Sequence, residues 1–124
     1  MKIENTRAQM RKGVLELCVL SIISQKESYP SDIINKLKEA KLIVVEGTLY
    51  PLLSRLKNAK LLSYEWKESR SGPPRKYYNL TEDGKKFLKG LSDTWKELNH
   101  AVSEATKTAS AATTRKRTAS TKTK

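Results

Sequence analysis

Residues 62–80 read LSYEWKESRSGPPRKYYNL, and they give the clearest indication of the fold class. Residues 62–67 alternate between apolar and polar side chains, and residues 76–80 are rich in strand-forming Tyr and Leu. The segment between them carries a glycine, two prolines and two arginines, which are the residues of a turn rather than of a strand or helix. The stretch therefore predicts a β-hairpin with a basic tip.

Two helices are predicted upstream by apolar spacing. From residue 5 to residue 23, Met10, Val14, Leu17 and their neighbours recur at helical intervals, which predicts a first helix buried on more than one side. The run Tyr29-Pro30-Ser31-Asp32 then provides a proline and capping-type residues for a short second helix that should end near Lys41.

A third helix should open at Glu46-Gly47-Thr48, after an apolar run at residues 42–45 that fits either a short strand or an extended linker. We expect Pro51 to fall in its first turn, where backbone N–H groups have no helical partner. Its inner face is predicted to consist of four leucines: Leu49, Leu52, Leu53 and Leu56.

A fourth helix should begin after Thr81, whose hydroxyl can cap the N–H groups of the first turn, and should end near Ala105. Its apolar residues are spaced three and four apart, the pattern of a coiled-coil seam. The predicted seam contains Leu88, Leu91, Trp95, Leu98 and Val102. A homodimer with two-fold symmetry is the economical way to cover it. The alternative is an amphipathic helix that lies on its own core.

The composition of the chain limits the classes of function that it can have. The chain has 124 residues and a formal net charge of +12, which favours a polyanionic partner such as nucleic acid. No stretch is long and apolar enough to span a membrane, and the N-terminus lacks the order of a signal peptide, so we expect a cytoplasmic protein. One Cys and one His cannot build a zinc site, and no catalytic or phosphate-cradling motif occurs. We therefore expect no enzyme activity, no metal and no cofactor.

Residues 106–124 contain Thr, Ala, Ser, Lys and Arg but no acidic, aromatic or large aliphatic residue. Such a segment cannot bury a core, and we predict a disordered basic tail. It is either a solubilising extension or an arm that follows phosphates along DNA.

Three helices followed by a basic hairpin give the order of a winged helix-turn-helix, in which the third helix enters the major groove of DNA. The fold class expected is mainly α with a small β-hairpin. Residues 1–80 would form the winged helix-turn-helix, and residues 81–105 the dimerisation helix.

Two motifs then carry a family resemblance. Residues 47–56, GTLYPLLSRL, and residues 72–84, GPPRKYYNLTEDG, resemble the PadR family of bacterial transcriptional regulators, over about residues 8–104. The resemblance implies a DNA-binding regulator that dimerises through its C-terminal helix. The single helix in that region is similar to the smaller branch of the family.

Residues for DNA contact follow from the two elements. The third helix should present side chains opposite its leucines, and the wing should present cations to phosphates. The predicted DNA-binding residues are Thr48, Tyr50, Pro51, Ser54, Arg55, Arg70, Arg75 and Lys76. As alternatives, Tyr50 packs beneath the second helix, Arg55 is a solvated charge and the wing is basic only for solubility.

Trp95 lies in the middle of the predicted seam. In a dimer its two copies would flank a cavity that can stack a planar aromatic effector, with Met10, Val14 and Asn99 as neighbours, which resembles the drug-responsive branch of the family. The alternative is a packing anchor.

We therefore expect a dimeric regulator, a repressor, on a pseudo-palindromic operator in double-stranded DNA of the nucleoid. The competing hypotheses are a non-specific DNA-compacting protein and an adaptor whose winged helix binds protein.

Overall fold

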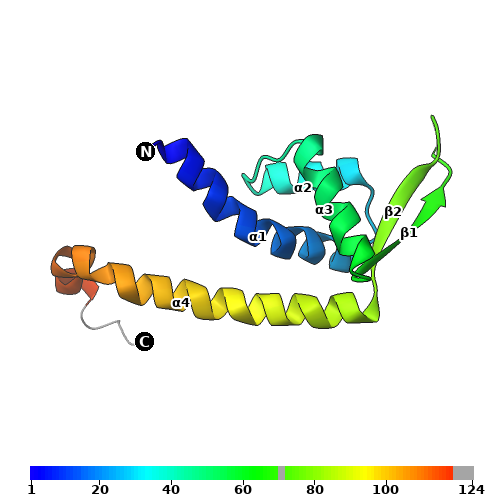
Figure 1. Cartoon of the computed structure of the whole chain (residues 1–124). Helices are drawn as coiled ribbons and strands as arrows, with labels where there is room; N and C mark the ends of the chain where they lie inside the picture. Colours follow the sequence, from blue (N-terminus) through cyan, green and yellow to red (C-terminus); the bar gives the residue numbers. More distant parts are fainter. Residues whose placement is uncertain (70–71, 119–124) are drawn as a thin grey trace. The chain divides into compact units, whose positions relative to one another are not determined.

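The chain folds in the order α1 (Ile3–Gln25), α2 (Pro30–Glu39), α3 (Glu46–Asn58), β1 (Leu62–Lys67), β2 (Arg75–Leu80) and α4 (Glu82–Thr118). Figure 1 shows this arrangement in a computed structural model, which describes the backbone of residues 1–69 and 72–118 and the side chains of these residues as far as residue 107. The prediction of a mainly helical fold with one hairpin is confirmed.

The core lies where α1, α2, α3 and the hairpin meet. All four leucines predicted for the inner face of α3 are buried, each with at most 5% of its surface exposed. They pack with Val19 and Leu20 of α1 and with Ile33 and Leu37 of α2. Residues 42–45 form neither helix nor strand, so they are the extended linker.

The first helix contributes to this core only through its C-terminal half. Val19, Leu20 and Ile23 are buried, whereas Met10 is 73% exposed. The expectation that the Met10 end is also buried is therefore wrong. No part of the described core packs on that end, so apolar spacing alone overestimated the length of the covered face.

Pro51 lies inside α3 rather than in its first turn, which corrects a second expectation. The helix already begins at Glu46, so Pro51 falls in the second turn. Its missing N–H leaves the carbonyl of Gly47 without a helical donor. Gly47 is exposed, and water can take the place of that donor.

The hairpin pairs β1 and β2 antiparallel, with Tyr64 opposite Tyr78 and Trp66 opposite Lys76. One face therefore carries Leu62, Tyr64 and Trp66 with their partners, and it meets the core through Leu62 and Tyr78. Adjacent Tyr77 lies on the other face, half-buried against Tyr29. Ser28 extends the sheet by a short bridge, exchanging two backbone hydrogen bonds with Tyr78.

The start of α4 is fixed by two adjacent turns. The hydroxyl of Thr81 accepts a hydrogen bond from the N–H of Gly84 at 2.9 Å, which confirms the predicted cap, and donates one to the carbonyl of Lys60 at 2.7 Å. Gly84 is packed so closely against the backbone of Leu61 that a Cβ at this position would lie 2.1 Å from the carbonyl oxygen of Leu61. Only glycine fits this position without a shift of the backbone.

The chain divides into two units, Met1–Leu91 and Ser92–Lys124. In the first unit, Leu88 and Leu91 of α4 are half-buried against the core. In the second unit, α4 continues to Thr118, beyond the end predicted near Ala105. Three alanines, two lysines and two arginines among residues 107–117 have high helix propensity, which favours the continuation of the backbone helix. Residues 119–124 lie outside the described part.

Candidate nucleic-acid interface

The face of α3 opposite its leucines is exposed along the whole helix. Thr48, Tyr50, Pro51, Ser54 and Arg55 are all exposed, as expected from their positions between the buried leucines. Tyr50 keeps 46% of its surface exposed, so it is not packed beneath α2. The helix thus offers the predicted set of side chains to a partner.

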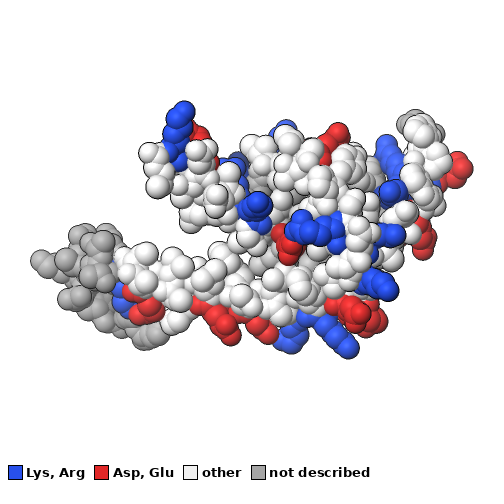
Figure 2. Space-filling view, in the orientation of Figure 1, with Lys and Arg blue, Asp and Glu red and all other residues white. Residues whose placement is uncertain are grey.

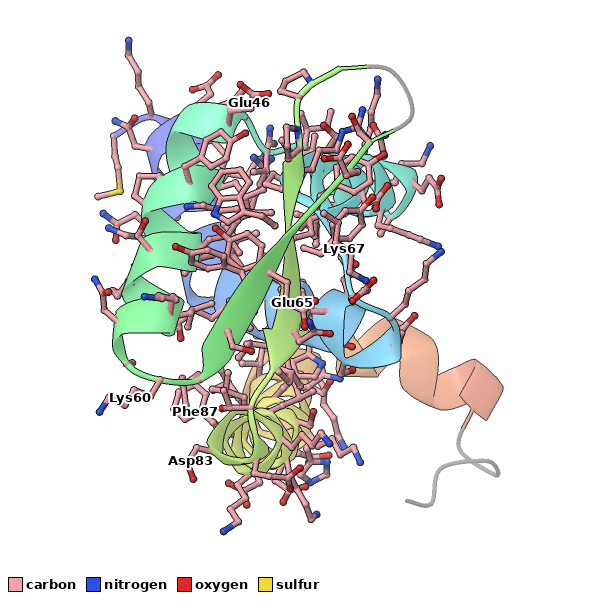
Figure 3. All side chains as sticks on the ribbon, turned by 90° about the vertical axis from the view of Figure 1, so that its right-hand side faces the viewer. Glu46, Lys60, Glu65, Lys67, Asp83 and Phe87 are labelled. Carbon is pink, nitrogen blue, oxygen red and sulfur yellow. The ribbon has the colours of Figure 1, made fainter. Side chains whose placement is uncertain are left out.

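A cleft of about 350 Å³ connects this face of α3 with the hairpin and with the start of α2. It is lined by Ser31 of α2, by Tyr50 and Ser54 of α3, and by Trp66, Arg75 and Lys76 of the hairpin. Figure 3 shows α3, which begins at Glu46 and ends two residues before Lys60, alongside the two strands. The cleft therefore brings together two residues predicted to read bases and two predicted to bind phosphates.

Both cations of the cleft are held against aromatic rings. The guanidinium of Arg75 lies 4.3 Å from the ring centroid of Tyr29, which itself packs edge-on against Tyr77. The ammonium of Lys76 lies 4.4 Å from the ring centroid of Tyr64 and 5.4 Å from that of Trp66. Cation–π contacts at exposed sites are worth about 0.5–1 kcal/mol, enough to favour one orientation of each side chain. The cations are thus partly ordered before any anion binds.

Charges on the hairpin differ between its two faces. Figure 3 shows Glu65 and Lys67 on the side turned away from α3. Lys67 forms an ion pair with Glu27, and the hydrogen bond to this carboxylate raises the pKa of Lys67.

Burial raises the pKa of the phenol of Tyr78, which borders the cleft from the core side. Lys and Arg side chains lie over α3 and the hairpin in Figure 2, interspersed with acidic ones.

Arg55 is engaged within the protein. Its guanidinium forms an ion pair with Glu16, although the side chain of Arg55 remains 62% exposed. This pair links α3 to α1. Arg55 does not line the cleft, and contact with DNA would require it to share or leave Glu16. Of the other predicted wing residues, Arg70 lies outside the described residues.

Tyr29, Ser31 and Trp66 also line the cleft, although none of them is among the DNA-binding residues predicted from the sequence. Alternation along residues 62–67 places Trp66 on the same face as Leu62 and Tyr64, which suggests burial. A role for Trp66 in DNA binding could have been inferred from its cross-strand partner, Lys76, which was already predicted to bind DNA.

The residues predicted for the seam fall into two groups. Leu88 and Leu91 are half-buried against the core of their own chain, so the interface prediction rests on the later positions. Trp95, Leu98 and Val102 are 41%, 53% and 51% exposed, respectively.

The residues predicted to bind an effector lie in both units. Val14 is half-buried and Met10 exposed in the first unit, and Trp95 and Asn99 are exposed in the second. Their association into one site stays a prediction. Among the described residues there is no group of three His, Cys, Asp or Glu side chains that could hold a metal ion, and no helix that could cross a membrane.

Comparisons with known proteins agree with this geometry. A sequence model of the transcriptional regulator PadR-like family matches residues 19–90. A PadR-like transcription factor from Bacteroides fragilis is 61% identical, with a TM-score of 0.69, and the match covers 82% of this chain and 98% of that one. A PadR-like transcriptional regulator from Bacillus cereus is 41% identical, with 78% and 95% coverage and a TM-score of 0.71. A PadR family regulator from Eggerthella lenta is 30% identical, with 83% and 90% coverage and a TM-score of 0.76.

Proposed function

Because the chain belongs to the PadR-like family of transcriptional regulators, whose members bind DNA, we propose that it acts as a homodimeric repressor on a pseudo-palindromic operator. The family consists of regulators and not of enzymes. A regulator whose target is the operator works in the cytoplasm, on the nucleoid, and this localisation is part of the proposal.

The observation that carries the proposal is the cleft between α3 and the hairpin. It combines side chains that can bond to base edges, Tyr50 and Ser54, with cations suited to phosphates, Arg75 and Lys76. A protein that binds DNA without sequence preference needs only the cations. The exposed polar and aromatic face of α3 favours a protein that also reads bases.

The proposed dimer rests on the exposed apolar residues of α4. Trp95, Leu98 and Val102 repeat at intervals of three and four, and each keeps more than two fifths of its surface in water within one chain. A second copy of the same helix can cover them by coiled-coil packing. Two-fold symmetry would then present two copies of α3 to two operator half-sites.

The effector is the third part of the proposal. Trp95 in two copies would offer two indole faces to a planar aromatic molecule, with Met10, Val14 and Asn99 at its edge. Such a ligand would change operator affinity only by its differential affinity for two dimer geometries. Quenching of Trp95 fluorescence by planar dyes, with weaker dye binding in Trp95→Ala, would support it. Unchanged dye affinity in Trp95→Ala would contradict the proposed effector site.

Two substitutions test the assignment of the cleft to DNA. Arg75→Ala should weaken binding to operator and random DNA alike and lower the slope of log affinity against log salt by about one, because one phosphate contact is lost. Tyr50→Ala should lower operator affinity by about 1–3 kcal/mol while random DNA is little affected.

Lys86→Ala is the matched control, because it removes one exposed cation that does not line the cleft. If Tyr50→Ala weakened operator and random DNA equally, Tyr50 would have no part in readout. If Arg75→Ala behaved like Lys86→Ala, the cleft would not be the phosphate-binding surface.

A further inference from the structure

Trp66 is unusually exposed for its residue type. It keeps 62% of its surface in water, whereas its cross-strand partner Lys76 is half-buried. Trp is normally among the more buried side chains and Lys among the most exposed, so the pair inverts the usual order. An exposed indole of this kind is typical of a contact surface.

The surroundings of Trp66 define what it can contact. It lies on the same hairpin face as Tyr64, at an inter-ring distance of 6.4 Å, and both rings approach the ammonium of Lys76. It also borders the cleft that contains Tyr50 and Ser54. An apolar plane, a positioned cation and the exposed face of α3 therefore adjoin one another.

This combination matches the backbone of a nucleic acid strand. Each nucleotide presents an apolar sugar edge next to an anionic phosphate, and an indole beside an ammonium complements both groups at once. A purely apolar partner would leave the Lys76 charge in an unfavourable environment. A small anion alone would leave the indole in water.

We propose that Trp66 is a DNA-contacting residue that packs against a deoxyribose while Lys76 binds the adjacent phosphate. The proposal rests on the proposed function, because it requires the cleft to face DNA. The contact fixes the position of the hairpin on the strand and carries no base preference, since it involves only sugar and phosphate.

Binding measurements separate the two roles. Trp66→Ala should lower affinity for operator and random duplex by the same factor, about five- to tenfold, without changing the salt slope, because a packing contact releases no counterions. Trp66→Phe should retain most of the affinity. Lys76→Gln should lower the salt slope by about one.

The matched control for Lys76 is Lys67→Gln, on the same hairpin but on the opposite face and engaged by Glu27. It should leave the slope unchanged. The control for Trp66 is Phe87→Ala, which removes an aromatic ring that is 40% exposed and does not line the cleft.

Fluorescence tests the contact without altering Trp66. In Trp95→Phe, emission comes from Trp66 alone, because the chain has two tryptophans. Saturation with random 20-base-pair duplex should change its intensity and wavelength. This measurement decides the question even if Trp66→Ala fails to fold.

Unchanged Trp66 emission at saturation, or unchanged affinity of folded Trp66→Ala, would overturn the inference. A loss confined to the operator would also overturn it, because it would make Trp66 a reader of bases. Wild-type protein that does not prefer any genomic sequence would instead contradict the proposed function.

Discussion

Gly84 shows how one residue can be required by its neighbours. A Cβ at this position would lie 2.1 Å from the carbonyl oxygen of Leu61 and 3.1 Å from the side chain of Leu80. Both neighbours are fixed, since Leu61 accepts a backbone hydrogen bond from Thr81 and Leu80 ends β2. The close approach of α4 to the turn before β1 therefore depends on the absence of a side chain.

Gly84→Ala should lower the free energy of unfolding by about 3 kcal/mol, because the backbone must move apart to admit the methyl group. Gly90→Ala is the control, since a Cβ there meets nothing within 4 Å. Alanine is favoured over glycine in a helix by about 0.5–1 kcal/mol, so Gly90→Ala should be stabilising. Urea denaturation measures both. Equal stability of the two variants would show that the contact at Gly84 does not constrain the fold.

The buried phenol of Tyr78 should make the free energy of unfolding depend on pH in the alkaline range. Burial raises the pKa of its phenol above the ordinary value of 10.0, so the folded chain retains this proton when the unfolded chain has lost it. Stability should therefore fall as pH rises above about 10, and the loss should level off once the folded pKa is passed.

Tyr78→Phe removes the titrating group and keeps the ring. Between pH 9 and 11, its urea midpoint should fall less than that of the wild type. A parallel fall in both proteins would mean that Tyr78 does not contribute to the alkaline loss.

At the scale of elements, the sequence predicted what local patterns control. The strand Leu62–Lys67 has the predicted bounds, and all four leucines of α3 are buried, because alternation and helical spacing determine which side chains share a face. Thr81 caps α4 because its hydroxyl acts within one turn. The exposed face of α3 followed directly from the buried one.

The features that the sequence patterns did not predict depend on residues far away along the chain. Met10 has apolar spacing but little described structure packed on it, and Trp66 continues an alternating strand but extends past the core into the cleft. The Arg55–Glu16 ion pair joins residues 39 positions apart. No local pattern indicates such a contact.

The exposed seam of α4 leads to a prediction about dimerisation of the chain. Leu98→Glu should convert a dimer to a monomer at micromolar concentration, because a carboxylate without a partner is costly in a buried interface. The fold of residues 1–91 should survive, since Leu98 lies outside that unit. Light scattering and far-UV circular dichroism measure the two effects. Leu91→Glu is less informative, because Leu91 also packs against the core.

His100→Glu is the control, since it adds one negative charge to the same exposed helix two residues after Leu98, away from the heptad seam. It should remain dimeric. A Leu98→Glu protein with wild-type mass in solution would contradict the proposed interface.

For the molecule as a whole, the formal charge of +12 favours binding to any DNA, and we propose that the cleft supplies the preference among sequences. In the proposed function, Arg75 and Lys76 bind phosphates beside Tyr50 and Ser54, which read bases, so one cleft combines both kinds of contact. A basic protein without such a reading face would compact DNA rather than regulate a promoter.

The most direct test is the ratio of two affinities. Fragments selected by the protein from its source genome would be compared with random duplex of equal length at 0.15 M salt. We predict a ratio of about 1,000 or more, with protection of two half-sites about one helical turn apart. A ratio near one, with affinity governed by salt alone, would contradict it.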